Sequence, residues 1–120
     1  MDFNRHKKIE LRYYTDNWGP FSFDFSAALP SGAAISAQTV KAFLGVVLPG
    51  DVLADQEDIS SDIIDEDFEP YVEDETKILL KLRYPADDTG LKGEQATLIF
   101  EITTDSGAMY PFYFHGVYIL

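Results

Sequence analysis

The sequence has no cysteine among its 120 residues, which excludes disulfides, thiolate metal ligands and thiol nucleophiles together. It also has no run of about 18 apolar residues, and its charged first eight residues are followed by no apolar signal region. We therefore predict a soluble protein without a signal peptide or membrane span, made in the cytosol and stabilised by packing alone.

Residues suited to catalysis are equally scarce. Only His6 and His115 could act as bases near neutral pH, and neither lies beside a nucleophile motif. The sequence contains no Gly-x-Ser-x-Gly elbow, no glycine-rich phosphate loop and no His-x-x-x-His pair. These absences predict a protein that is not an enzyme, with no catalytic residue and no bound cofactor.

Lysine and arginine are missing from one long stretch, which we call the acidic segment (residues 51–75). Twelve of the 21 acidic residues lie there, so the other 95 residues carry nine acidic and nine basic side chains, and the net charge of −12 belongs to this segment. Phosphate backbones are bound by clustered Lys and Arg, so nucleic acid is not expected as a partner.

Oxygen ligands for calcium are abundant in the acidic segment. The most usable spacing is that of Asp62, Asp65, Asp67 and Glu69, but the EF-hand pattern is absent and no glycine lies between Val52 and Glu75. The sequence favours a solvated acidic loop or an electrostatic docking surface here, and a calcium site at these four residues stays the alternative.

Apolar and aromatic residues are plentiful, at 46% and 14% of the chain, which is enough for one buried core. Alternating apolar and polar residues predict strands over 9–13, 21–26, 76–84, 95–104 and 109–120, with the first at a sheet edge and an Asp105-Ser106-Gly107 turn joining the last two. We expect a polar arm over 1–8 and one β domain over 9–120 that includes the acidic loop 51–75.

Two segments are less regular. Residues 33–44 contain helix-forming alanines, but β-branched residues favour a strand from Ile35 to Leu48, with Gly45 as a bulge or break. Part of the acidic segment is expected to pair as a middle strand. The sum is an all-β, antiparallel immunoglobulin-like sandwich of about seven strands, and a small closed barrel is the alternative.

The last strand has apolar residues on both faces, whereas a strand in a sandwich buries one. Its second face must be covered by a loop, by the N-terminal arm or by another chain. We predict a protein interface at Tyr113, His115, Val117 and Ile119, with a partner protein or a second copy of the chain as the other side.

A family resemblance rests on three runs: Phe23 to Val40, Gly93 to Leu98, and Ile102 to Gly107. They resemble small immunoglobulin-like virion proteins of tailed phages and prophages, above all those of the fibre-to-tail adaptor type. The likeness extends from about Trp18 to the end, except that the acidic insertion between Pro49 and Thr76 replaces a shorter connection. It implies a structural or adaptor role in a virion, contacts with other virion or assembly proteins, and no active residues.

A different function class stays open from the residues themselves. Tyr14, Trp18 and Tyr71 could form a stacking platform for a sugar or another ligand. The alternative is therefore a bacterial carbohydrate- or ligand-binding β-sandwich module.

Overall fold

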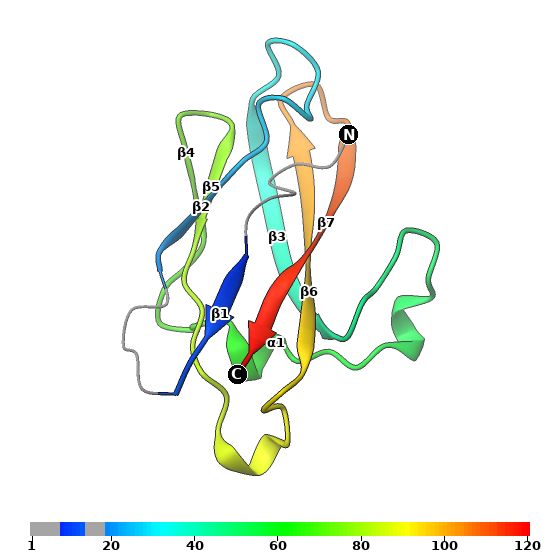
Figure 1. The fold of residues 1–120 in the computed structure, drawn as a ribbon. Coiled ribbons are helices and arrows are strands. Elements are labelled where there is room, and N and C mark those ends of the chain that lie inside the picture. Colours follow the sequence, from blue (N-terminus) through cyan, green and yellow to red (C-terminus); the bar gives the residue numbers. More distant parts are fainter. Residues whose placement is uncertain (1–7, 14–18) are drawn as a thin grey trace.

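Two sheets packed face to face make up the computed structural model, which describes residues 8–13 and 19–120 (Figure 1). The strands are β1 (Ile9–Leu11), β2 (Phe21–Asp24), β3 (Ile35–Leu44), β4 (Tyr71–Glu73), β5 (Lys77–Leu80), β6 (Gln95–Thr104) and β7 (Met109–Ile119). One sheet has the order β1-β7-β6-β3 and the other β2-β5-β4. The predicted all-β sandwich of about seven strands is confirmed.

The strand order is that of an immunoglobulin-like fold. The second, fifth and fourth strands share one sheet, and the third, sixth and seventh share the other, as in immunoglobulin domains. β1 lies at the edge of the four-stranded sheet, as predicted, but it runs parallel to β7, with Ile9 opposite Val117. The other paired strands are antiparallel.

Aromatic rings from both sheets meet in the centre of the core. Phe23 of β2 contacts Phe100 of β6 with ring centroids 4.8 Å apart, and Phe114 of β7 with centroids 5.2 Å apart. Phe25, which follows β2, packs on Phe100 and on Phe112. The period-two phenylalanines of residues 21–26 therefore point inward as the sequence predicts, with Phe23 and Phe25 fully buried.

The predicted strands are present, with clearly shorter limits in four cases, since β1 ends at Leu11, β2 at Asp24, and β3 and β5 also end early. Residues 35–44 form a strand and not a helix, but β3 ends at Leu44 and not at Leu48, since Gly45 takes a φ of 80°. β5 ends at Leu80, beyond which Leu82 pairs with Ile64 only as an isolated bridge. The short helices η1 (Leu53–Asp55), α1 (Ser60–Ile63) and η2 (Asp87–Thr89) have no counterpart in the sequence-based expectation.

A β-bulge in β7 overturns part of the predicted interface. Leu98 of β6 pairs with Phe114, but Ala96 pairs with Val117, so that both His115 and Gly116 lie opposite Thr97. The extra residue reverses the alternation of β7. Its inward residues are Tyr110, Phe112 and Phe114 before the bulge and Val117 and Ile119 after it.

The central ring contact gives a stability prediction. Replacing the fully buried Phe100 with alanine removes the ring that touches both Phe23 and Phe25, and it should lower the free energy of unfolding by about 3–5 kcal/mol. Denaturant unfolding followed by circular dichroism measures this change. Met109→Ala, at a side chain 68% exposed, is the control and should stay within about 0.5 kcal/mol of wild type. Equal effects of the two substitutions would contradict the assigned core.

Candidate functional site

Part of the outer face of the four-stranded sheet, around Phe43, Ile99 and Tyr113, is covered by residues 45–58, which we call the covering segment. Val47 from this segment is buried against Phe43 of β3 and Ile99 of β6, and Leu53 and Tyr113 pack around them. This second, small core explains why Ile99 breaks the apolar alternation of its strand. The cover expected over the last strand is thus supplied by the chain itself at Tyr113.

Two side chains of the sheet hold the main chain of Val47. Its N–H donates to Oγ1 of Thr97 at 3.0 Å, and its carbonyl lies 2.8 Å from Nε2 of His115, which acts as the donor because a carbonyl can only accept. The Thr97 hydroxyl in turn donates to the carbonyl of Gly45 at 2.7 Å. We call these three hydrogen bonds the Val47 clasp.

The bulge in β7 places one half of this clasp. Because two residues lie opposite Thr97, the His115 side chain stands on the outer face beside the covering segment. The His115 carbonyl accepts a hydrogen bond from Nε2 of Gln95 at 2.7 Å, which ties the bulge to the start of β6.

The four residues predicted as an interface therefore separate. Tyr113 and His115 are half-buried on the outer face, next to the covering segment. Val117 and Ile119 are 0% exposed and belong to the core between the sheets, so assigning them to the interface is wrong. A strand with strict period two would have put all four on one face, and the bulge prevents this.

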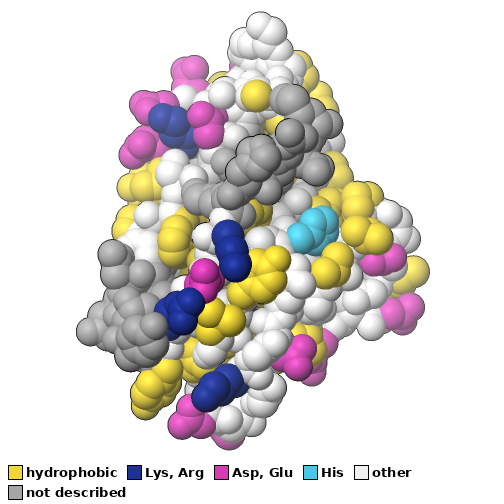
Figure 2. All heavy atoms as spheres, viewed as in Figure 1, with side chains coloured by type: hydrophobic (Ala, Val, Ile, Leu, Met, Phe, Trp, Pro, Cys, Tyr) yellow, Lys and Arg dark blue, Asp and Glu magenta, His cyan; other side chains and the backbone are white. Residues whose placement is uncertain are grey.

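Exposed apolar side chains do occur close by, on the covering segment. Val46, Leu48 and Val52 are 52%, 53% and 60% exposed, and we call them the loop patch. Val46 and Leu48 flank the clasped Val47. Figure 2 shows hydrophobic side chains gathered near the histidine, with acidic ones at the rim, and in Figure 1 the segment extends away from the sheets. This patch was not predicted from the sequence, because the third strand was expected to continue through these residues.

The acidic segment is built into the fold. Ile59 and Ile63 are buried in the main core, and β4, predicted to be a middle strand, is the outer strand of its sheet. Its carboxylates are exposed or half-exposed, including those of Asp62, Asp65, Asp67 and Glu69. Among residues 8–13 and 19–120, no three acidic or histidine side chains gather in a group that could hold a metal ion.

Two residues of the alternative stacking platform, Tyr14 and Trp18, lie outside the described residues. The third, Tyr71 of β4, is 46% exposed and packs beside Phe68 with ring centroids 5.9 Å apart.

Comparisons with known protein families, curated proteins and solved structures gave no match to this chain. No helix in the described ranges is long and apolar enough to cross a membrane.

Two carboxylates at turns have a lowered pKa. For Asp58 the largest cause is hydrogen bonding from the Ser60 side chain, and the Ser60 N–H, which donates to Oδ1 at 2.9 Å, and the charge of Lys41 also lower the pKa against the effect of burial. For Asp24 the largest cause is the hydrogen bond from the Ser26 N–H. Each carboxylate accepts the N–H of the residue two positions ahead, which is Ser26 at the start of the turn after β2 and Ser60 at the start of α1.

The Val47 clasp predicts a local effect of Thr97→Val. Valine keeps the shape but leaves the Val47 N–H and the Gly45 carbonyl without their partner, so residues 45–52 should open more often. Amide hydrogen exchange at Val47 should speed up by about tenfold or more, and proteolysis within the segment should increase. Thr103→Val, elsewhere on β6, is the matched control. Unchanged exchange at Val47 in Thr97→Val would contradict the clasp.

The lowered pKa of Asp58 predicts that the stability of the folded protein depends on pH. Since its folded pKa is lowered, its ionised form contributes stability above its unfolded pKa of about 3.9, and that contribution is lost as the pH falls through the folded pKa. Asp58→Asn removes the charge and keeps the acceptor. The melting temperatures of variant and wild type should differ more at about pH 7 than at about pH 2. A difference that is the same at both values would refute this role.

Proposed function

We propose that this protein is a non-enzymatic structural adaptor of a phage or prophage particle, acting through contacts with other virion proteins. The observation that supports this proposal most strongly is the loop patch. Three apolar side chains that are more than half exposed lie within seven residues on one segment. Exposed apolar side chains that gather in one place are typical of protein interaction sites.

The clasp makes the loop patch suited to binding. Val47 is fixed by its buried side chain and by hydrogen bonds to both of its main-chain groups, so Val46 and Leu48 on either side are held in place before a partner arrives. A surface that is ordered in advance loses less conformational entropy on binding.

The charge around the loop patch selects the partner. Asp51, Asp55 and Glu57 are exposed on the same segment, and no basic residue lies between Pro49 and Thr76. An apolar partner surface with a basic rim would complement it, and charge complementarity would set orientation and association rate more than affinity. The resemblance of Phe23 to Val40 and of the last hairpin to fibre-to-tail adaptors supports a virion as the setting.

The proposal predicts that the loop patch is needed for assembly. In a host strain that produces the particles, Leu48→Asp combined with Val52→Asp should reduce the amount of protein recovered in purified particles by about tenfold or more, because each lost apolar anchor of an interface costs about 1 kcal/mol or more. Quantitative immunoblotting of the particles measures the amount.

Met109→Asp is the control, since it places one aspartate, against two in the double variant, at an apolar side chain that is 68% exposed at the start of β7. It should be incorporated as wild type. Absence of the wild-type protein from particles would refute the adaptor role. Normal incorporation of the double variant would show that the loop patch is not the interface.

A further inference from the structure

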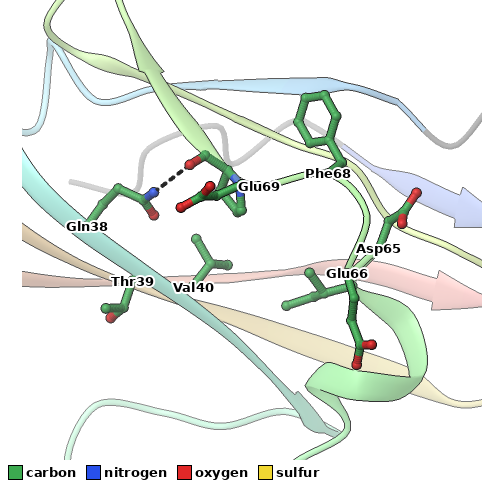
Figure 3. A pocket seen from close by; sticks show the side chains of 9 residues that line it. Gln38, Thr39, Val40, Asp65, Glu66, Phe68 and Glu69 are labelled. Atoms are coloured by element: carbon green, nitrogen blue, oxygen red, sulfur yellow. Dashed lines mark hydrogen bonds between the residues drawn. The ribbon is translucent and has the colours of Figure 1, made fainter.

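A groove runs along the side of the sandwich, where β3 of one sheet faces the connection that leads into β4 of the other (Figure 3). One wall is residues 38–40 of β3, and the other is formed by residues 64–66 and 68–70. Its volume is about 480 Å³. A second hollow of about 270 Å³ shares Val40, Ile64 and Glu66 with it and continues towards α1.

The edge of β3 is closed by the chain's own backbone at one end of this groove. Ala42 donates its N–H to Oγ of Ser60 and accepts from the N–H of Ile59, both at 2.8 Å, and Leu44 donates to the carbonyl of Glu57 at 2.9 Å. The segment 57–60 thus closes this end of the edge, with Asp58 opposite Phe43 in an isolated bridge. At the other end of β3, Ile35 donates to the carbonyl of Glu75.

Between these two closed ends the edge of β3 is open. In an antiparallel pair every second residue turns its N–H and carbonyl away from the partner strand. Since Ala42 faces away from β6, so do Val40 and Gln38, opposite Phe100 and Ile102. Among the described residues no other main-chain group pairs with theirs. Two donors and two acceptors therefore face the groove.

The Gln38 side chain leaves a further acceptor unused. Its Nε2 donates to the carbonyl of Pro70 at 3.0 Å across the groove, while its Oε1 is buried and has no hydrogen-bond partner. Turning the amide around would lose the bond to Pro70. A buried acceptor without a partner is costly, and a donor brought by a ligand would relieve that cost.

The side chains around the groove indicate what would fill it. Val40, Ile64 and Phe68 supply apolar surface, and in Figure 3 the side chain of Val40 points into the groove. Asp65, Glu66 and Glu69 lie on the opposite wall. Asp65 has Lys81 at 3.9 Å, whereas within the described ranges Glu66 and Glu69 make no ion pair.

We propose that this groove binds an extended basic peptide segment of a partner protein, which adds as a strand to the open edge of β3. Main-chain hydrogen bonds to Gln38 and Val40 would supply the pairing, apolar side chains would lie on Val40 and Ile64, and Lys or Arg would face Glu66 and Glu69. The open stretch, residues 36–41, is about 20 Å long at about 3.3 Å per residue, which suits a segment of about six residues. This site is separate from the loop patch and does not depend on the adaptor role.

The test uses three blocked hexapeptides as probes: alternating Lys and Val, the same peptide fully N-methylated, and alternating Glu and Val. Only the first should bind at concentrations up to about 1 mM, because N-methylation removes the donors and glutamate is repelled by the acidic wall. Amide exchange measured by NMR should slow at Gln38 and Val40. It should not change at Thr39 and Lys41, whose main-chain groups already face β6.

Variants of the full chain separate the contribution of main-chain pairing at the edge of β3 from the contribution of the acidic wall. Val40→Pro removes a donor that faces the groove and leaves the pairing with β6, so peptide affinity should fall by about tenfold or more. Glu66→Lys combined with Glu69→Lys should reverse the preference towards the Glu-Val peptide. Asp88→Lys combined with Glu94→Lys makes the same change in net charge at exposed side chains that do not line the groove and is the control. If Val40→Pro does not fold, the charge variants still decide.

Several outcomes would overturn the proposal: no slowed exchange at Gln38 and Val40, equal binding of the N-methylated peptide, or an unaltered preference in the Glu66/Glu69 variant. Slowed exchange at these amides without peptide, together with a dimer in sedimentation, would assign the edge to a second copy of the chain instead. Variants of the loop patch should bind the Lys-Val peptide as wild type does, so failure of the adaptor role is distinguishable from failure of this site.

Discussion

The ring contact between Phe23 of β2 and Phe100 of β6 joins the two sheets at the centre of the core, and the rest of the fold depends on this contact. In antibody domains a disulfide links the second and sixth strands, and this chain has no cysteine. Two rings with centroids 4.8 Å apart stand there instead, and Phe25, Phe112 and Phe114 extend the cluster. Cohesion between the sheets therefore comes from apolar burial and ring packing, which are strong only while the cluster stays dry and well packed.

The position of this cluster explains the need for the bulge in β7. Phe112 and Phe114 must face inward to reach Phe23 and Phe25, and Val117 must also face inward beside β1. Positions 114 and 117 are three apart, so strict alternation cannot satisfy both, and one extra residue at His115 and Gly116 resolves the conflict. The same bulge sets His115 beside Val47. The packing of the core thus determines the position of His115, which is part of the clasp that holds the loop patch.

The strands could be predicted from sequence wherever alternation reported burial directly, as in the phenylalanines of β2 and in Ile78 and Leu80 of β5. The burial of Val117 and Ile119 could not be predicted. A bulge moves every later residue of the strand to the opposite face, and it has no periodic sequence pattern that would indicate its presence. Gly116 in the middle of an aromatic strand was the available signal, since glycine inside a strand often marks a bulge. The covering segment was missed for a related reason: Val46, Val47 and Leu48 satisfy β propensity as well as β3 does, and only Gly45 with its positive φ separates them. β propensity therefore does not indicate the residue at which a chain leaves a sheet.

The connection between β3 and β4, residues 45–70, joins the two sheets across the side of the sandwich, and both proposed surfaces lie along it. Its first half covers part of the outer face of the four-stranded sheet and presents Val46, Leu48 and Val52, while its second half forms the far wall of the groove on the edge of β3. Ile59 and Ile63 between them are buried in the core, so the two halves are anchored separately. A face and an edge of one strand point in perpendicular directions, which means that an apolar partner on the loop patch and an extended peptide in the groove would not compete for the same space. The acidic charge of the connection would then act on both contacts at once. Raising the salt concentration should weaken peptide binding in the groove more than partner binding at the loop patch, because salt screens ion pairs and leaves apolar burial nearly unchanged.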